Sequence, residues 1–365
     1  MTEKEKIILQ LIKDDPFISQ NELAEKTGLS RSAVAGYVSS LMKQGKIHGR
    51  AYILPEQKEI LCIGGANIDR KIQVAEKLEY NTSNPASSTQ SCGGVARNIA
   101  ENLGRLGIGA ALMTVVGEDH EGQWLLEYTK SFADITPSQT LSGRQTGTYT
   151  AVLDADGEMV LALADMSICD AVDMNFIEKK WGHLSSSQMV ILDTNFPHHV
   201  LKQIISRCDE ESIPLCIAPV SSPKVKKLPA KLNGVAWLIA NQDEAEALSQ
   251  TRISNEGDFF KAAEVILNKG VERVVITRGD KGLIYYTKSG EAGVLLAPKV
   301  PISDVTGAGD SLVAGIMFAH LKGLAAEDAC KIGMVCSLLT LQSHETVNPV
   351  LNQTRLQEAF KQYFH

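Results

Sequence analysis

The heptapeptide DVTGAGD occupies residues 304–310 and runs directly into the apolar stretch SLVAGIMFA at residues 311–319. A glycine-rich turn that opens a helix leaves the first backbone N–H groups without helical partners, and such helix starts bind anions. Gly307 and Gly309 would let a phosphate approach the backbone closely. Asp310 would lie beside that anion, where it repels phosphate but can remove a proton from an attacking hydroxyl. The alternative is that Asp310 only caps the helix and that the glycines serve packing.

Composition limits the class of protein. The chain has 365 residues, of which 44% are hydrophobic and 22% are charged, and it carries seven cysteines. This balance excludes a mostly disordered, collagen-like or disulfide-scaffold protein, and the length favours two domains or one large domain with an appendage. We find no apolar run long enough for a membrane helix, no signal peptide and no C-x-x-C pair. We therefore expect a cytoplasmic protein with reduced thiols and no membrane partner.

The N-terminal segment differs from the rest in charge. The whole chain has a net charge of −7, but residues 26–55 carry five Lys or Arg side chains and no Asp or Glu. An S-x-x-E capping box at residues 19–22, a turn glycine at Gly28 and a helix-capping serine at Ser30 predict consecutive short helices. The glycine-punctuated, β-rich residues 45–54 predict a hairpin after the last helix.

Helix, glycine turn, helix and basic hairpin together resemble the winged helix-turn-helix modules of bacterial transcription regulators. The resemblance implies that the third helix lies in the major groove of double-stranded DNA, and that the protein is a homodimer, because such regulators usually read two half-sites. Basic side chains would neutralise phosphates and make binding salt-dependent. The predicted DNA-binding residues are Ser30, Arg31, Ser32, Lys43, Lys46 and Arg50. The alternative is a helical docking or oligomerisation module whose basic side chains only face solvent.

Beyond this module, apolar β-rich runs alternate with helical patterns. The alternation predicts an α/β domain with a mainly parallel sheet that is covered on both faces. Residues 148–153 and 159–164 differ, because they flank the turn dipeptide Asp156-Gly157 and predict an antiparallel flap outside the main sheet. We therefore predict a helical domain at residues 1–57 and an α/β domain at residues 58–365.

The heptapeptide resembles the C-terminal signature of the PfkB/ribokinase family of sugar and nucleoside kinases. Further motifs occur in that family's order, namely GGANID at residues 64–69, CGGVARNIAENLGRLG at residues 92–107, NQDE at residues 241–244 and TRGDKG at residues 277–282. The sequence contains no Walker P-loop, which excludes a P-loop kinase. The resemblance implies a ribokinase-like three-layer α/β/α domain with a mainly parallel sheet and a small β lid. ATP would bind at the carboxyl ends of the strands.

The resemblance also implies roles for individual residues. Asp310 is the implied base, and Gly307, Ala308 and Gly309 would hold the transferring phosphoryl group. The implied substrate pocket contains Asn67, Asp69, Gly93, Gly94 and Asn98, and the implied nucleotide contacts are Asn241, Thr277, Gly279, Gly282 and Asn348. Glu244 would order Mg²⁺ through water. Many relatives hold a monovalent cation at the loop that Asp304 and Thr306 match, so K⁺ is a further implied cofactor.

Two stretches resemble the pseudouridine kinase subgroup, TGTYTAVLDADGEM at residues 146–159 and LDTN at residues 192–195. Asp165 and Ser167, at the root of the flap, are the implied contacts to a nucleobase edge. The alternative is that Asp165 only caps a turn. One departure from the pattern is Ala218, where relatives often carry an acidic residue.

We therefore expect an ATP- and Mg²⁺-dependent kinase that phosphorylates the 5′-hydroxyl of a nucleoside, with pseudouridine as the first choice, joined to a DNA-binding head. Two alternatives stay open. The acceptor could be ribose or another sugar, or the protein could be a transcription regulator whose kinase-like half senses a sugar or nucleoside with little turnover. The intact pair of Asp310 and Glu244 favours an active enzyme, because a sensor has no chemical need for a base.

Overall fold

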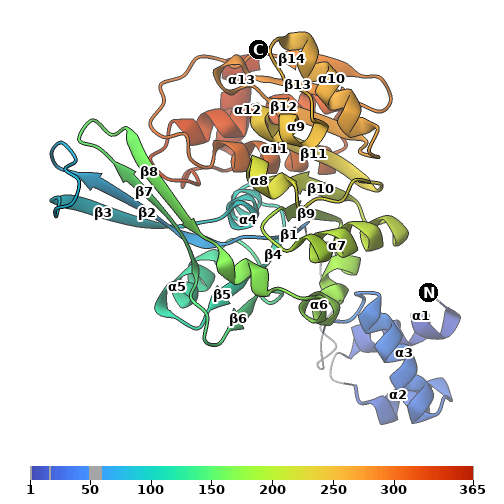
Figure 1. Cartoon of the computed structure of the whole chain (residues 1–365). Helices are drawn as coiled ribbons and strands as arrows, with labels where there is room; N and C mark the ends of the chain where they lie inside the picture. Colours follow the sequence, from blue (N-terminus) through green and yellow to red (C-terminus); the bar gives the residue numbers. More distant parts are fainter. Residues whose placement is uncertain (1, 16–17, 49–59, 365) are drawn as a thin grey trace.

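The computed structural model describes residues 2–15, 18–48 and 60–364 (Figure 1). The predicted domain boundary between residues 57 and 58 lies outside the described residues, as do Arg50 and most of the predicted hairpin. Residues 44–46, where the predicted hairpin would begin at residue 45, form a turn directly after the third helix.

The N-terminal part, called the head below, is a three-helix module of α1 (Glu3–Asp14), α2 (Gln20–Thr27) and α3 (Arg31–Lys43). The predicted capping box is confirmed, because the Ser19 hydroxyl accepts from the Glu22 N–H and the Glu22 carboxylate accepts from the Ser19 N–H. Gly28 ends α2 in the left-handed conformation with a φ of 65°. One apolar cluster holds the three helices together and includes Ile8, Ile12, Leu23, Val34 and Leu41.

The rest of the chain is built on an eight-stranded sheet with the order β14-β13-β12-β11-β10-β9-β1-β4. The strands from β12 to β4 are parallel to one another, and β13 pairs antiparallel with β12 on one side and with β14 on the other. The strands are β1 (Ile60–Ile63), β4 (Ala110–Met113), β9 (Met189–Asp193), β10 (Leu215–Ala218), β11 (Val235–Asn241), β12 (Arg273–Thr277), β13 (Leu283–Thr287) and β14 (Ala292–Leu295). β1, β4, β9 and β10 are buried along their whole length, as strands covered on both faces are.

Helices cover both faces of this sheet, so the predicted three-layer α/β/α domain is confirmed (Figure 1). One face packs against α6 (Met174–Ser186), α7 (His198–Glu210), α9 (Gln242–Ser249) and α10 (Glu256–Leu267). The other face packs against α4 (Val95–Arg105), α11 (Ala308–Leu321) and α12 (Ala326–Leu341). The remaining elements are α5 (His120–Thr129), α8 (Ser222–Val225), α13 (Gln353–Phe364), η1 (Ser167–Ala171), η2 (Gly279–Lys281), β5 (Val115–Gly117) and β6 (Gln139–Leu141). Within the described ranges, none of the helices has the length and apolar character to cross a membrane.

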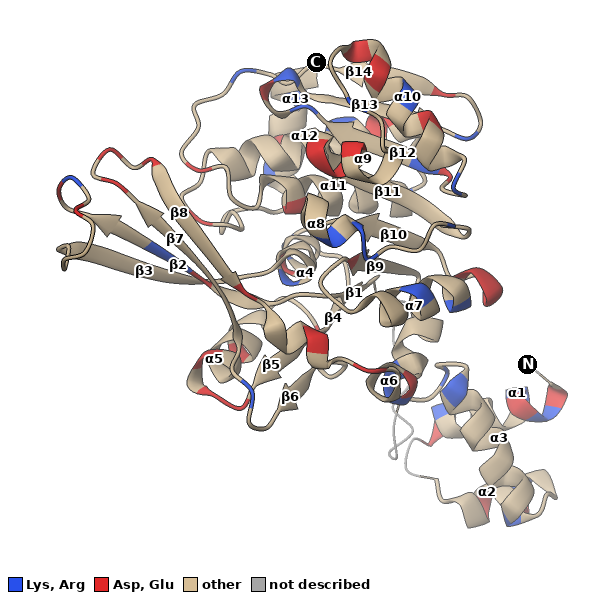
Figure 2. Ribbon diagram, in the orientation of Figure 1, with Lys and Arg blue, Asp and Glu red and all other residues tan. Residues whose placement is uncertain are grey.

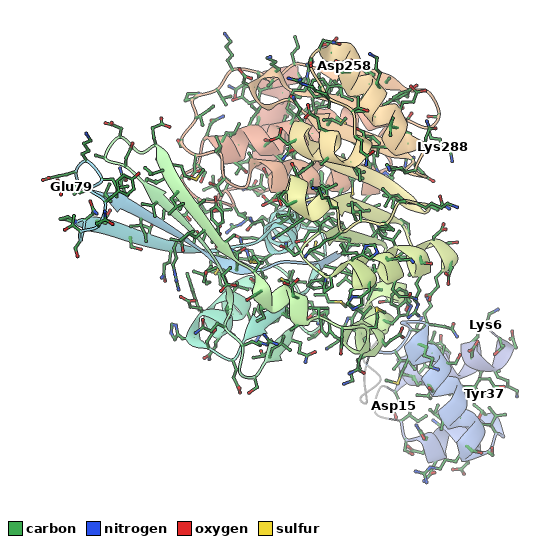
Figure 3. All side chains as sticks on the ribbon, in the orientation of Figure 1. Lys6, Asp15, Tyr37, Glu79, Asp258 and Lys288 are labelled. Atoms are coloured by element: carbon green, nitrogen blue, oxygen red, sulfur yellow. The ribbon has the colours of Figure 1, made fainter. Side chains whose placement is uncertain are left out.

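A second sheet projects from one side of the domain and is called the lid (Figure 1). Its strand order is β3-β2-β7-β8, with β2 (Asn67–Val74), β3 (Ala86–Gly93), β7 (Gly147–Leu153) and β8 (Met159–Asp165). The predicted antiparallel flap is confirmed as the β7-β8 hairpin, which pairs through β7 with β2. Glu79 lies in the connection between β2 and β3, at the tip of the lid (Figure 3).

The head contacts α6 of the α/β domain through the end of α3 and the turn that follows it. Ser185 Oγ donates to the Lys43 carbonyl oxygen over 3.1 Å, and His48 Nε2 lies 3.0 Å from Ser186 Oγ. At Gly45 a Cβ would lie only 2.3 Å from the Gly182 carbonyl oxygen, so glycine permits this close approach. The opposite end of α3, which begins at Arg31, is exposed.

Candidate active site

The glycine turn before α11 has the conformation of an anion-binding loop. Gly307 is the N-cap of α11 with a φ of 78°, and a Cβ there would lie 1.9 Å from the Thr346 carbonyl oxygen, so only glycine fits. At Gly309 a Cβ would meet no atom within 4 Å. α11 has no side-chain cap, and the N–H groups of Gly309 and Asp310 have no acceptor within the helix, which suits them to bind an anion. The alternative that Asp310 is the N-cap is wrong, because Gly307 holds that position.

Asp310 has the surroundings of a base. Asn98 Nδ2 donates to Asp310 Oδ2 over 2.7 Å. Burial raises the pKa of Asp310 to about 7, against the lowering effects of Asn98 and Arg97, and the negative charges of Asp193 and Asp69 raise it further. A base is most effective when its pKa lies near the working pH, so Asp310 is suited to accept a proton under neutral conditions.

A buried ionic network orients Asn98. Its Oδ1 accepts from Arg97 Nε over 3.2 Å and from a second guanidinium nitrogen of the same side chain, so its Nδ2 must face Asp310. The Arg97 guanidinium in turn binds Glu101 over 2.6 Å, and both side chains are only 1% exposed. Arg105 also binds Glu101, over 2.7 Å. Because moving the Arg97 guanidinium or the Glu101 carboxylate would leave a buried charge unpaired, this pair is fixed, and it holds the Asn98 amide toward Asp310.

The predicted substrate residues at the root of the lid lie together. Asn67 Nδ2 donates to Asp69 Oδ1 over 2.6 Å, and Asn67 is paired across the strands with Gly93. A Cβ at Gly93 would lie 2.2 Å from Asp69 Oδ2, so the carboxylate rests directly against the glycine backbone. Gly94 precedes α4 with a φ of 103°. Burial raises the pKa of Asp69, while Asn67 and the nearby cations oppose the rise.

Asp193, which the sequence motifs did not mark as a site residue, joins three parts of this site through hydrogen bonds. Its Oδ2 accepts from Gly65 N over 2.7 Å and from Ala96 N over 3.3 Å, and its Oδ1 accepts from Asn195 N over 2.8 Å. Asp193 is 1% exposed, and its hydrogen bonds hold the loop after β1 against the start of α4. A signal was present in the sequence, because the LDTN stretch sets a carboxylate at the end of an entirely apolar strand.

The predicted nucleotide residues lie at the carboxyl ends of β11 and β12. Asn241 and Thr277 are partners in the strand register, and Gly279 and Gly282 form the turn after β12 with φ values of 62° and 89°. Asn348 does not support the predicted nucleotide contact, because it is buried. Its Nδ2 donates to the Leu339 carbonyl and its Oδ1 accepts from Val350 N.

At the lid root, Asp165 Oδ1 accepts from both the N–H and the hydroxyl of Ser167, at 3.1 and 2.8 Å. The turn-capping contact that was the alternative for Asp165 is therefore present. Both side chains lie at the start of η1, beside the end of β8, and they contact each other directly.

Glu244 fits the implied role toward Mg²⁺. Among the described residues, no group of three or more His, Cys, Asp or Glu could hold a metal ion, so phosphate oxygens and water would have to supply most ligands. Glu244 Oε2 accepts from Asn241 N over 2.9 Å in a capping box. Burial raises the pKa of Glu244 to about 7, which a nearby divalent cation would offset.

The implied K⁺ site does not fit the residues present. Asp304 Oδ1 accepts from Thr306 N over 2.8 Å and from Thr306 Oγ1 over 2.7 Å. Asp304 Oδ2 forms an ion pair with Lys71 of the lid. The carboxylate that would bind an alkali ion is therefore already paired with an ammonium group.

The predicted DNA-binding residues lie at the two ends of α3. Ser30, Arg31 and Ser32 are exposed at its start, and the Ser30 hydroxyl caps the helix by accepting from Ala33 N over 3.2 Å. Lys43 is exposed at the other end, next to α6, and Lys46 follows it, partly buried. Lys and Arg residues of the head occur in all three helices (Figure 2).

Comparisons with known proteins agree with this geometry. Residues 57–353 match the pfkB family carbohydrate kinases, and residues 1–48 match a winged helix-turn-helix DNA-binding family. The chain is 33% identical over 298 residues to the pseudouridine kinase of Escherichia coli (strain K12), covering 81% of this chain and 95% of that protein. It is 30% identical over 353 residues to the uncharacterized sugar kinase YeiI of the same strain, covering 96% of this chain and 97% of that protein.

Solved structures show the same fold. The carbohydrate kinase from Agrobacterium tumefaciens matches with a TM-score of 0.72 at 26% identity, over 84% of this chain and 97% of that one. The ribokinase from Thermotoga maritima matches with a TM-score of 0.71 at 22% identity, over 84% of this chain and 100% of that one. The chain therefore belongs to the pfkB family of carbohydrate kinases and carries a winged helix-turn-helix domain ahead of the kinase domain.

Proposed function

We propose that the protein transfers the γ-phosphoryl group of ATP, with Mg²⁺, to the 5′-hydroxyl of a nucleoside, and that pseudouridine is its substrate. The observation that carries the proposal is the Asp310 carboxyl, with a pKa near 7, in the first turn of a helix whose glycine loop presents N–H groups to an anion. The 33% identity to a pseudouridine kinase supports the choice of nucleoside.

In the proposed reaction, the substrate 5′-hydroxyl gives its proton to Asp310 as its oxygen attacks the γ-phosphorus. The bond from that phosphorus to the β,γ-bridging oxygen breaks, and ADP leaves with the electron pair. The N–H groups of Gly309 and Asp310 stabilise the charge on the transferring group, with Gly307 and Ala308 shaping the turn. Mg²⁺ would neutralise the triphosphate charge when it is bound, and Glu244 would order its water ligands.

The substrate is held, in this proposal, by the lid root. The half-buried Asp69 carboxylate and the buried Asn67 amide would pair with ribose hydroxyls, together with the backbone at Gly93 and Gly94. Such groups discriminate strongly, because a ligand without the matching hydroxyl leaves them unpaired. Asp165 and Ser167 are the proposed base contacts, and Asn241, Thr277, Gly279 and Gly282 the proposed nucleotide contacts. Asn98 acts by orienting Asp310 as well as lining the pocket.

We propose that the head binds double-stranded DNA through α3, with Arg31 at the exposed start of this helix and Lys43 at its other end each reaching a phosphate. The assembly would be a homodimer. β8 is the edge strand of the lid and exposes Met159, Leu161 and Leu163, the kind of apolar edge that a second copy can cover. Sedimentation of the purified chain measures the oligomeric state, and a monomer at micromolar concentration would contradict the proposed homodimer.

The central experiment is a phosphotransfer screen of the full chain with ATP and Mg²⁺ over pseudouridine, uridine, other nucleosides, ribose and other pentoses. We expect pseudouridine to be the best acceptor and Asp310→Asn to remove the activity. If a free sugar is phosphorylated best, that sugar and not a nucleoside is the substrate. Ligand binding without phosphate transfer by the wild type would assign the kinase half to sensing.

A further inference from the structure

Lys71 is the lid side chain that reaches the phosphate-binding loop. Successive side chains of a strand point to opposite faces, so Asn67, Asp69 and Lys71 share one face of β2. Arg70 points to the other face, where it pairs with Glu121 of α5. Lys71 therefore follows Asp69 on the face of β2 that carries the proposed substrate residues, and it lies nearer the tip of the lid.

The partner of Lys71 is Asp304, 233 residues away in the chain and three residues before Gly307. The Lys71 ammonium binds Asp304 Oδ2, while Asp304 Oδ1 accepts both donors of Thr306. Both carboxylate oxygens are thus engaged. An alkali ion at this carboxylate would lie beside the ammonium, and the two positive charges would repel each other.

The ion pair is protected from solvent. The side chains of Lys71 and Asp304 are 29% and 18% exposed, so salt screens their attraction less than it screens a surface pair. Burial by itself raises the pKa of Asp304, but Lys71 and the Thr306 donors outweigh it, and the net pKa is lowered. Asp69, two residues before Lys71, also interacts with this ammonium. The positive charge of Lys71 is therefore shared between Asp304, beside the glycine loop, and Asp69, at the root of the lid.

We propose that Lys71 supplies, from the lid, the positive charge that a monovalent cation supplies in many relatives, so that this kinase needs no K⁺. The inference rests on the proposed kinase function and adds to it. Asp304 anchors Thr306, and Thr306 directly precedes Gly307, so the ammonium holds the turn that shapes the phosphate loop. Because Lys71 belongs to the lid, the charge is in place only when the lid lies against this loop. Lys71 is a positioning residue.

The test compares the wild type with Lys71→Met in K⁺ and in tetramethylammonium at equal ionic strength, using the full chain. Lys77→Met, a change of an exposed lid lysine, is the matched control. We expect wild-type turnover to be the same in both salts. We expect Lys71→Met to lose about tenfold or more in tetramethylammonium and to regain at least about fivefold in K⁺, a normal size for coupling between a bound effector and a second site.

A second readout does not depend on turnover. Thermal unfolding is followed without nucleoside or nucleotide. K⁺ should raise the midpoint of Lys71→Met by about 2 °C or more and leave the wild type and Lys77→Met unchanged. A wild type that K⁺ activates or stabilises overturns the inference, as does a Lys71→Met variant that K⁺ neither activates nor stabilises. If the screen finds no acceptor, the proposed function fails, while the unfolding data still decide the inference. Lys71→Gln replaces Lys71→Met if that variant does not fold.

Discussion

Arg31 of the head and Arg97 of the kinase domain both lie in the first turn of a helix, but their surroundings are opposite. Arg31 is exposed at the start of α3. Arg97 in α4 is 1% exposed, binds Glu101 and orients the Asn98 amide that faces Asp310. The difference shows two ways of building a functional surface. In the head, separate exposed side chains would act nearly independently, whereas in the kinase site each group depends on buried neighbours.

The largest expected effect is on the kinase site. Asp310→Asn keeps the size of the side chain and can still accept from Asn98 Nδ2, but it cannot take a proton. We expect turnover to fall by about 10²–10⁴-fold, the range for loss of a general base. Initial rates of ADP release measure the change. Calorimetric titration of pseudouridine is the control, and it should show that the variant still binds the nucleoside. Normal turnover by Asp310→Asn would contradict the assignment of Asp310 as the base.

The comparison of the two arginines is tested directly by Arg97→Met and Arg31→Met. Arg97→Met removes the guanidinium from a buried carboxylate, so we expect the free energy of unfolding to fall by about 3–5 kcal/mol, and turnover to fall because the Asn98 amide is released. Arg31→Met should stay within about 0.5 kcal/mol of the wild type. Denaturant unfolding of both variants measures this, and equal losses would remove the distinction between the two regions.

The pH dependence of kcat/KM tests whether Asp310 is the titrating group of the kinase site. The pKa of Asp310 is raised to about 7, and only the deprotonated form can act as the base. We therefore expect kcat/KM for the nucleoside to rise about tenfold per pH unit below pH 7 and to level off above it. The same raised pKa means that the folded protein holds this proton more tightly, so this group's contribution to stability decreases as the pH rises through 7. A flat profile between pH 5 and 8 would exclude Asp310 as the titrating base.

The smallest effect is expected in the head. Arg31→Ala removes one exposed charge, so DNA affinity should fall uniformly across sequences, and the slope of log affinity against log salt should shrink by about 1. Gel shifts with genomic fragments at several salt concentrations measure both quantities. Lys288→Ala, in the kinase domain and distant from the head (Figure 3), is the control and should bind like the wild type. Unchanged affinity and slope for Arg31→Ala would argue against the proposed DNA surface.

Local features of the site were predictable because their cause is local. The capping box predicted at residues 19–22 joins groups three residues apart, and it is present in the structure. Residues 241–244, which the sequence marked as an N-x-x-E motif, form a second capping box that was not predicted. The left-handed Gly307 follows from the glycine turn before an apolar helix. In contrast, Asn348 had a suitable position in the sequence, but the structure shows its amide bound to the loop around it. The sequence could not show which groups would form hydrogen bonds with the Asn348 amide, because that depends on how the loop folds.

From the sequence alone, the alternation of strands and helices and the ordered glycine motifs determined the α/β/α fold, the three-helix head and the glycine loop before α11. Only the tertiary structure decided which side chains meet across long stretches of chain. Asn98 meets Asp310 across 212 residues, Gly65 meets Asp193 across 128, and Lys71 meets Asp304 across 233. Turns and caps depend on neighbouring residues, but the pKa of a base and the charge at a loop depend on groups that only the folded chain brings within reach.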